Sequence, residues 1–228
     1  MPTPPTGMPL VPTPRAPQRK ERADAARNRQ RVLLAAEELF ARRSVESVTM
    51  DDIAAAAGVG KGTLYRRFTD KGGLAAELLS ERGAELQRAI LEGPAPLGPG
   101  PAAGADSGAG TSAGTGAGTA ADPAARLEAF CAAYLAFQER HLDLVLLSET
   151  SSPGGRLRKR SYEFWRQHTE VLLRAAHVPD ARVRAEVLLA ALSAEQVRHW
   201  TRNEGRTLDD LTVALTGVVR SLIGSPAA

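Results

Sequence analysis

The stretch "TMDDIAAAAGVGKGTLYRRF", residues 49–68, decides the fold of the front part of this chain. Thr49 with Asp52 three residues later forms a capping box, which predicts that a helix begins there. Gly58 is suited to end that helix in a turn, and a second short helix is expected to reach Phe68. Two short helices joined by a tight turn are the pattern of a helix-turn-helix motif at about residues 49–68.

The alternating glycines of this stretch could instead indicate a phosphate-binding loop of an enzyme. A P-loop requires Gly-Lys-Ser/Thr, but Lys61 is followed by Gly62, and a dinucleotide-binding loop follows a strand rather than a helix. The rest of the sequence has no paired acid and base, no nucleophile beside a base and no Cys/His group at metal-ligand spacing. We therefore predict that the protein is not an enzyme and uses no metal and no cofactor.

The net charge of +3 is unevenly distributed along the 228 residues. From Arg15 to Lys71 there are 13 Lys and Arg against 8 Asp and Glu, whereas the rest of the chain has 16 against 18. A basic front part indicates a polyanionic partner, although a mixed solvated surface would have the same balance. Because the chain has one cysteine, no signal-peptide pattern and no apolar run near the ~20 residues that span a bilayer, we expect a cytoplasmic protein without a membrane partner.

Two low-complexity stretches divide the chain. Residues 1–18 are rich in proline and are expected to form a disordered arm, and residues 93–121 are nearly all small and are expected to form a disordered linker. Residues 19–92 and 122–224 show apolar residues at helical spacing and no strand-like alternation. The predicted fold class is all-α, with an amino-terminal helix-turn-helix domain that includes a connecting helix, and a carboxy-terminal helical domain.

The second helix of the motif has an inner and an outer side. Leu64 has the spacing of a buried residue, and the side chains left outside are Lys61, Thr63, Tyr65, Arg66 and Arg67, with Lys71 just beyond. Such a helix fits the major groove of double-stranded DNA. An exposed tyrosine among basic residues is poorly explained by a solvated surface alone, so we predict DNA as the partner.

The segment "VTMDDIAAAAGVGKGTLYRRFTDKGGL" behind "RVLLAAEELFARR" resembles the DNA-binding domain of the TetR family of bacterial transcriptional regulators over roughly residues 27–86. The resemblance implies a homodimer that binds a near-palindromic operator, acts by default as a repressor and is released by a small apolar effector. An activator or a ligand-independent regulator is the alternative, and a non-specific DNA-binding protein is a more distant one. The implied DNA contacts are Thr49, Lys61, Gly62, Thr63, Tyr65, Arg66, Arg67 and Lys71.

The sequence departs from the family pattern at Gly60, where serine is common, and at Gly72 and Gly73, which replace Glu-Ala at the start of the connecting helix. Two glycines there predict a soft first turn. Basic residues from Arg19 to Arg29 form either a minor-groove arm or a solubilising tail.

The carboxy-terminal domain is expected to bind the effector and to form the dimer. Aromatic and other residues at helical spacing could line an effector pocket, although such residues more often form a core. The pocket candidates are Phe130, Tyr134, Phe137, Leu147, Phe164, Trp165, His168 and Trp200. Apolar stripes on the last two long helices predict an intermolecular four-helix bundle. The interface candidates are Leu188, Ala191, Leu192, Leu211, Leu215, Val218 and Leu222.

Overall fold

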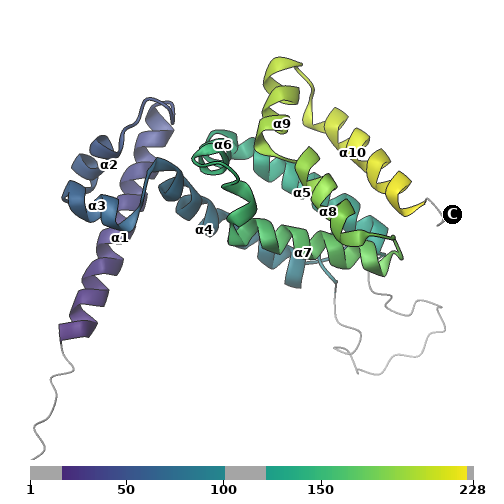
Figure 1. Ribbon diagram of the computed structural model, residues 1–228, viewed down its shortest axis with the longest axis horizontal. Coiled ribbons are helices and arrows are strands. Elements are labelled where there is room, and N and C mark those ends of the chain that lie inside the picture. The colour runs from purple at the N-terminus through teal and green to yellow at the C-terminus, as the bar shows by residue number, and fades with distance from the viewer. Residues whose placement is uncertain (1–16, 101–121, 225–228) are drawn as a thin grey trace, which may run out of the picture. The chain divides into compact units, whose positions relative to one another are not determined.

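The computed structural model describes residues 17–100 and 122–224, and of residues 17–21 it gives the backbone alone. Every element within these ranges is a helix (Figure 1). The predicted arm at 1–18 and linker at 93–121 lie mostly outside the described residues. The chain divides into two compact units, up to Arg67 and from Phe68 onward. The connecting helix thus belongs to the second unit, whereas the sequence placed it with the first.

The first unit holds three helices: α1 (Pro17–Arg42), α2 (Met50–Ala57) and α3 (Lys61–Arg67). α2 packs on both α1 and α3, and Val32, Ile53 and Leu64 are buried. The predicted capping box is present, because the Thr49 hydroxyl accepts from the Asp52 N–H at 3.1 Å and the Asp52 carboxylate accepts from the Thr49 N–H at 3.0 Å. The Thr49 N–H and the Thr49 hydroxyl, together with the Arg43 guanidinium, hold the pKa of Asp52 below its usual value.

The turn between α2 and α3 depends on a left-handed residue. Gly58 caps α2 with φ of 60°, a conformation that costs a residue with a Cβ about 1–2 kcal/mol. The N–H of Val59 then donates to the carbonyl of Ala54 at 3.1 Å, which closes the end of α2. The tight turn predicted from the sequence is confirmed, and it fixes where α3 begins.

The second unit contains the remaining helices. They are α4 (Lys71–Glu92), α5 (Pro123–Arg140), α6 (Leu142–Thr150), η1 (Arg156–Arg158), α7 (Arg160–Ala175), α8 (Ala181–Ala191), α9 (Ala194–Arg198), η2 (His199–Asn203) and α10 (Leu208–Ile223). α4 packs on α6, α7 on α8, and α5 on α10. The core is continuous from Ile90 of α4 through Phe130 and Leu173 to Val219 of α10.

Close packing around the first turn of α4 explains why one of its two glycines, Gly72, has no side chain. Gly72 is buried, and a Cβ there would lie 2.2 Å from the Cβ of Ser151 and 3.1 Å from the carbonyl oxygen of Leu147. Only a residue without a side chain permits this approach of α4 to the end of α6. Gly73 is exposed, and its N–H donates to the α4 cap Asp70 at 2.7 Å.

Gly72→Ala is expected to lower the free energy of unfolding by about 1–3 kcal/mol, because the new methyl group clashes with Ser151. Adding Ser151→Gly should restore most of the loss, since both of the nearest atoms belong to the serine side chain. Gly73→Ala is the matched control and should be neutral or stabilising. Denaturant unfolding measures all of these, and equal effects of the two alanine variants would contradict the packing argument.

Candidate nucleic-acid interface and interior cavity

The side chains predicted to contact DNA in the first unit lie at or near the surface. Leu64 is the one residue of α3 that is buried, and Tyr65 is 49% exposed although it is aromatic. Arg66 and Arg67 are exposed beside it, and Thr63 is partly buried. Because Leu64 is buried and the polar side chains point outward, the outer side of α3 is accessible to a partner.

Thr49 can serve two roles at once. Its hydroxyl oxygen accepts the hydrogen bond from the Asp52 N–H, and in the free protein its own O–H proton interacts with the Asp52 carboxylate. The residue is exposed at the start of α2. A phosphate oxygen is a suitable acceptor for this proton, and the capping bond would be kept when it binds.

Lys61 has a partner in the free protein. Its Nζ lies 2.6 Å from Oδ2 of Asp51, and this hydrogen bond and charge raise the pKa of Lys61. Both side chains are exposed, so the pair contributes little to stability. The lysine can therefore leave Asp51 for a nucleic acid at small cost.

The other basic candidates lie on α4 and α1, and Lys71 is at the start of its helix, as the sequence predicts. Lys71 begins α4, in the second unit, and already has an interaction partner. Arg22, Arg27 and Arg29 lie within helix α1. An extended arm that follows a groove is thus not present at these three residues, because their backbone is helical.

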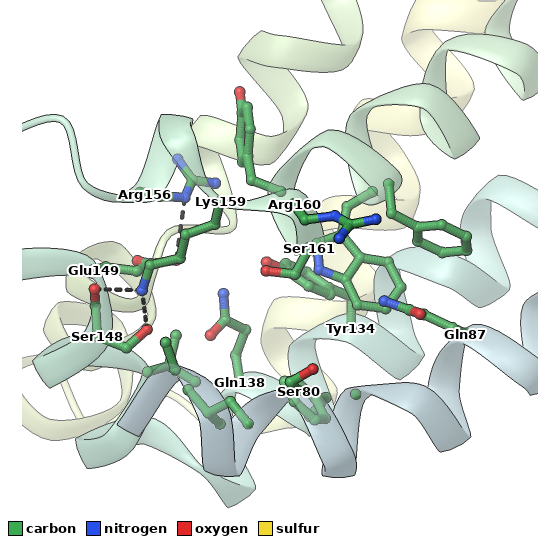
Figure 2. Close-up of a pocket in the computed structure, with 18 of the residues that line it drawn as sticks. Ser80, Gln87, Tyr134, Gln138, Ser148, Glu149, Arg156, Lys159, Arg160 and Ser161 are labelled. Atoms are coloured by element: carbon green, nitrogen blue, oxygen red, sulfur yellow. Dashed lines mark hydrogen bonds and ion pairs between the residues drawn. The ribbon is translucent and has the colours of Figure 1, made fainter. Parts of the chain in front are cut away.

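A cavity of about 640 Å³ lies within the second unit, between α4, α5, α6 and α7 (Figure 2). Four of the predicted pocket residues line it, and they are Tyr134, Phe137, Phe164 and Trp165. The other four do not line it, and they are Phe130, Leu147, His168 and Trp200. Phe130 is instead fully buried in the core, with its ring 5.6 Å from that of Tyr134.

Sequence reasoning missed most of the polar lining. The polar residues that line the cavity include Gln138, Ser148, Glu149, Arg156, Lys159 and Arg160. The run "RLRKR" at 156–160 did not point to a pocket, because a basic run usually covers a solvated surface. Only the pairing of α6 with the turn before α7 brings Arg156 and Lys159 of this run to the cavity.

Some apolar residues of α8 and α10 are buried and others are exposed. Leu188, Leu192, Leu211 and Leu215 are buried within their own unit, so they cannot contact a second chain. Ala191 and Leu222 are partly buried, and Val218 is exposed. The apolar residues of these two helices that are exposed are Val183 and Val187 of α8, and Val213 and Val218 of α10.

Within the described residues no three His, Cys, Asp or Glu side chains gather to hold a metal ion. No helix in those ranges is both long and apolar enough to cross a membrane.

Comparison with known proteins gives the same assignment for the front part. Residues 32–78 match the family model described as bacterial regulatory proteins, tetR family. HTH-type transcriptional regulators of Staphylococcus aureus strains USA300 and NCTC 8325 are 49% identical over 53 residues, which are 23% of this chain and 29% of each relative. The chain thus spans less than a third of the curated relatives it matches.

Solved structures extend the likeness to the whole fold. A transcriptional regulator from Rhodococcus sp. RHA1 has a TM-score of 0.57 at 19% identity, over 88% of this chain and 98% of that one. NalD of Pseudomonas aeruginosa, the secondary repressor of the MexAB-OprM multidrug efflux pump, has 0.52 at 20%, over 86% and 96%. FadR of Bacillus halodurans, a fatty acid degradation regulator, has 0.54 at 16%, over 84% and 93%. At these identities the likeness establishes the all-α fold.

His168 provides a pH test of the core beside the cavity. Its Nε2 is buried without a hydrogen-bond partner and its ring packs edge-on against Phe130 at 5.2 Å. Burial, with a smaller effect of Arg126, lowers the pKa of His168 to about 4.

We expect acidification to destabilise the protein through His168. Between the ordinary pKa near 6.5 and the folded value near 4, the unfolded chain binds a proton that the folded one does not, so stability falls as pH falls. Unfolding at about pH 7.5 and about pH 4.5 should show His168→Gln losing less stability than the native chain, by on the order of 2 kcal/mol. Equal losses would show that the histidine does not resist protonation.

Proposed function

We propose, on the premise that residues 32–78 belong to the tetR family of bacterial regulatory proteins, that the whole chain is a transcriptional regulator that represses genes by binding operator DNA. The observation that carries this proposal is α3, a short helix with one buried leucine and an outer side of threonine, tyrosine and arginines. An α-helix of this kind enters the major groove, and the basic residues neutralise phosphates. Thr49 and Lys61 would add contacts beside it.

A homodimer follows from the length of α3. Seven residues contact too few bases to specify a site, so two copies would each read one half of a near-palindromic operator. The exposed valines of α8 and α10 support this, because apolar side chains are costly to leave in water. Paired α8 and α10 helices of two chains would form a four-helix bundle.

Release by an effector is supported by the place of α4. The helix supplies Ala76, Ser80 and Gly83 to the cavity wall, and its first turn is pressed against the end of α6 at Gly72. Residues 68–70 alone separate α4 from α3 along the chain. A ligand that changes how α4 lies against α6 would therefore move the chain that leads into α3, and operator affinity would fall by the ligand's differential affinity for the two states.

The test uses genomic fragments that the purified protein retains, with a shuffled duplex of the same length as control. Arg66→Ala and Tyr65→Ala should each weaken binding to the retained fragment by about tenfold, because each removes a contact made by the outer side of α3. Arg198→Ala is the matched control, since Arg198 is an exposed arginine on α9, and it should leave binding unchanged. Fluorescence anisotropy measures the affinities.

Equal affinity of the native chain for the retained and shuffled duplexes would indicate a non-specific DNA-binding protein. Unchanged binding by both α3 variants would contradict the proposed interface. Loss of a reporter's repression on deleting the gene supports a repressor, whereas loss of its expression supports an activator.

A further inference from the structure

The cavity has one apolar wall. Phe164 and Trp165 of α7 lie edge to face with ring centroids 4.9 Å apart, and the Tyr134 ring of α5 is 5.4 Å from that of Trp165. All three line the cavity. A wall of this kind favours a flat or elongated apolar body, and a volume of about 640 Å³ is that of a site for a drug-sized molecule.

The side-chain amide of Gln138 in the cavity lining is fully buried, and its oxygen has no hydrogen-bond donor. Gln138 has no exposed surface, and its Nε2 donates to the carbonyl of Leu192 at 2.9 Å, which fixes the orientation of the amide. Its Oε1 accepts no hydrogen bond. Figure 2 shows the side chain projecting between Ser148 and Tyr134. A buried acceptor left without a donor costs about 1–3 kcal/mol, so a ligand with a hydroxyl or N–H group would recover that loss.

The carboxylates that line the cavity do not offer it a free negative charge. Glu149 lies 3.2 Å from Nε of Arg156 and also accepts the N–H of Ala194 at 3.2 Å. Arg156 in turn donates to the carbonyl of Leu189 and lies over the Tyr162 ring. Glu77 already has a partner of its own. The Glu149–Arg156 pair is therefore neutral towards a ligand.

Lys159 supplies positive charge beside this pair, and Arg160 lines the cavity farther from it (Figure 2). The Lys159 ammonium donates to the carbonyl and the hydroxyl of Ser148, which uses two of its three N–H groups (Figure 2). Burial lowers the pKa of Lys159, opposed by Glu149 and Asp70. An anion beside the ammonium would offset the cost of that burial, whereas a cation would increase it.

We propose that the cavity binds an amphipathic organic anion: an apolar body against Tyr134 and Trp165, a carboxylate- or sulfonate-type group at Lys159, and a hydrogen-bond donor at Gln138. This assignment names the class of the effector and rests on the proposed function. It adds charge to the small apolar effector expected from the sequence, because the basic lining was not visible there.

The test compares two dyes that share one skeleton. 8-Anilinonaphthalene-1-sulfonate carries a sulfonate, and N-phenyl-1-naphthylamine is the same molecule without it, and both carry an N–H. Titration of the full chain, followed by energy transfer from tryptophan, should show the sulfonate binding about tenfold more tightly. Equal affinities, or tighter binding of the neutral dye, would overturn the proposal.

Variants locate the dye and its charge. Lys159→Met should lower the affinity for the sulfonate dye about tenfold and leave the affinity for the neutral dye unchanged, so that the preference disappears. Arg158→Met, one residue away, exposed and outside the lining, is the control and should retain the preference. Trp165→Phe should weaken the binding of both dyes, because it removes part of the apolar wall. Unchanged affinity for both dyes would place them elsewhere and overturn the proposal.

Folding of each variant is checked by circular dichroism, and Lys159→Gln replaces Lys159→Met if the latter does not fold. Binding of the retained genomic fragment is measured on the same preparations without dye. Sequence-specific DNA binding with no sulfonate preference would reject the effector class and leave the proposed function intact. If the native chain shows no sequence-specific DNA binding, the proposed function itself is rejected.

Discussion

The left-handed turn at Gly58 is the constraint on which the first unit depends. The Thr49–Asp52 capping box fixes where α2 begins, and Gly58 fixes where it ends, so α2 has one length and one direction. α3 then starts three residues later with Leu64 buried, which sets which side of the helix faces outward. Tyr65, Arg66 and Arg67 are exposed because the capping box, the turn at Gly58 and the burial of Leu64 fix the orientation of α3.

Helix α4 follows α3 after residues 68–70 and packs within the second unit. Its first turn approaches α6 so closely that residue 72 has room for no side chain, and its middle forms part of the cavity wall. Close packing of this kind transmits small displacements, because interiors do not absorb added volume. From the sequence alone, Gly72 and Gly73 predict a soft first turn in α4. At Gly72 the structure gives a different reason for the glycine, because it permits close contact between α4 and Ser151.

The sequence contained enough to predict the helix-turn-helix, because caps, turn glycines and helical spacing are local signals. Helix α4 and the all-α class were predictable for the same reason. The polar lining of the cavity was not, since Gln138, Lys159 and Glu149 come from three segments that only tertiary packing brings together. The apolar stripe of α8 was predictable, but which of its residues are exposed was not: Leu188 and Val187 are neighbours in the chain, yet one is buried and the other is exposed. Helical spacing identifies an apolar helix, and packing decides which of its residues remain for a partner.

The central claim is that α3 lies in the major groove of an operator, once per subunit. Methylation interference with dimethyl sulfate tests it most directly, because the reagent modifies guanine N7 in the major groove and adenine N3 in the minor groove of the same duplex. The account predicts that methylated guanines in two symmetric half-sites block binding, whereas methylated adenines do not. Interference at adenines alone, or at neither base, would show that α3 does not read the major groove.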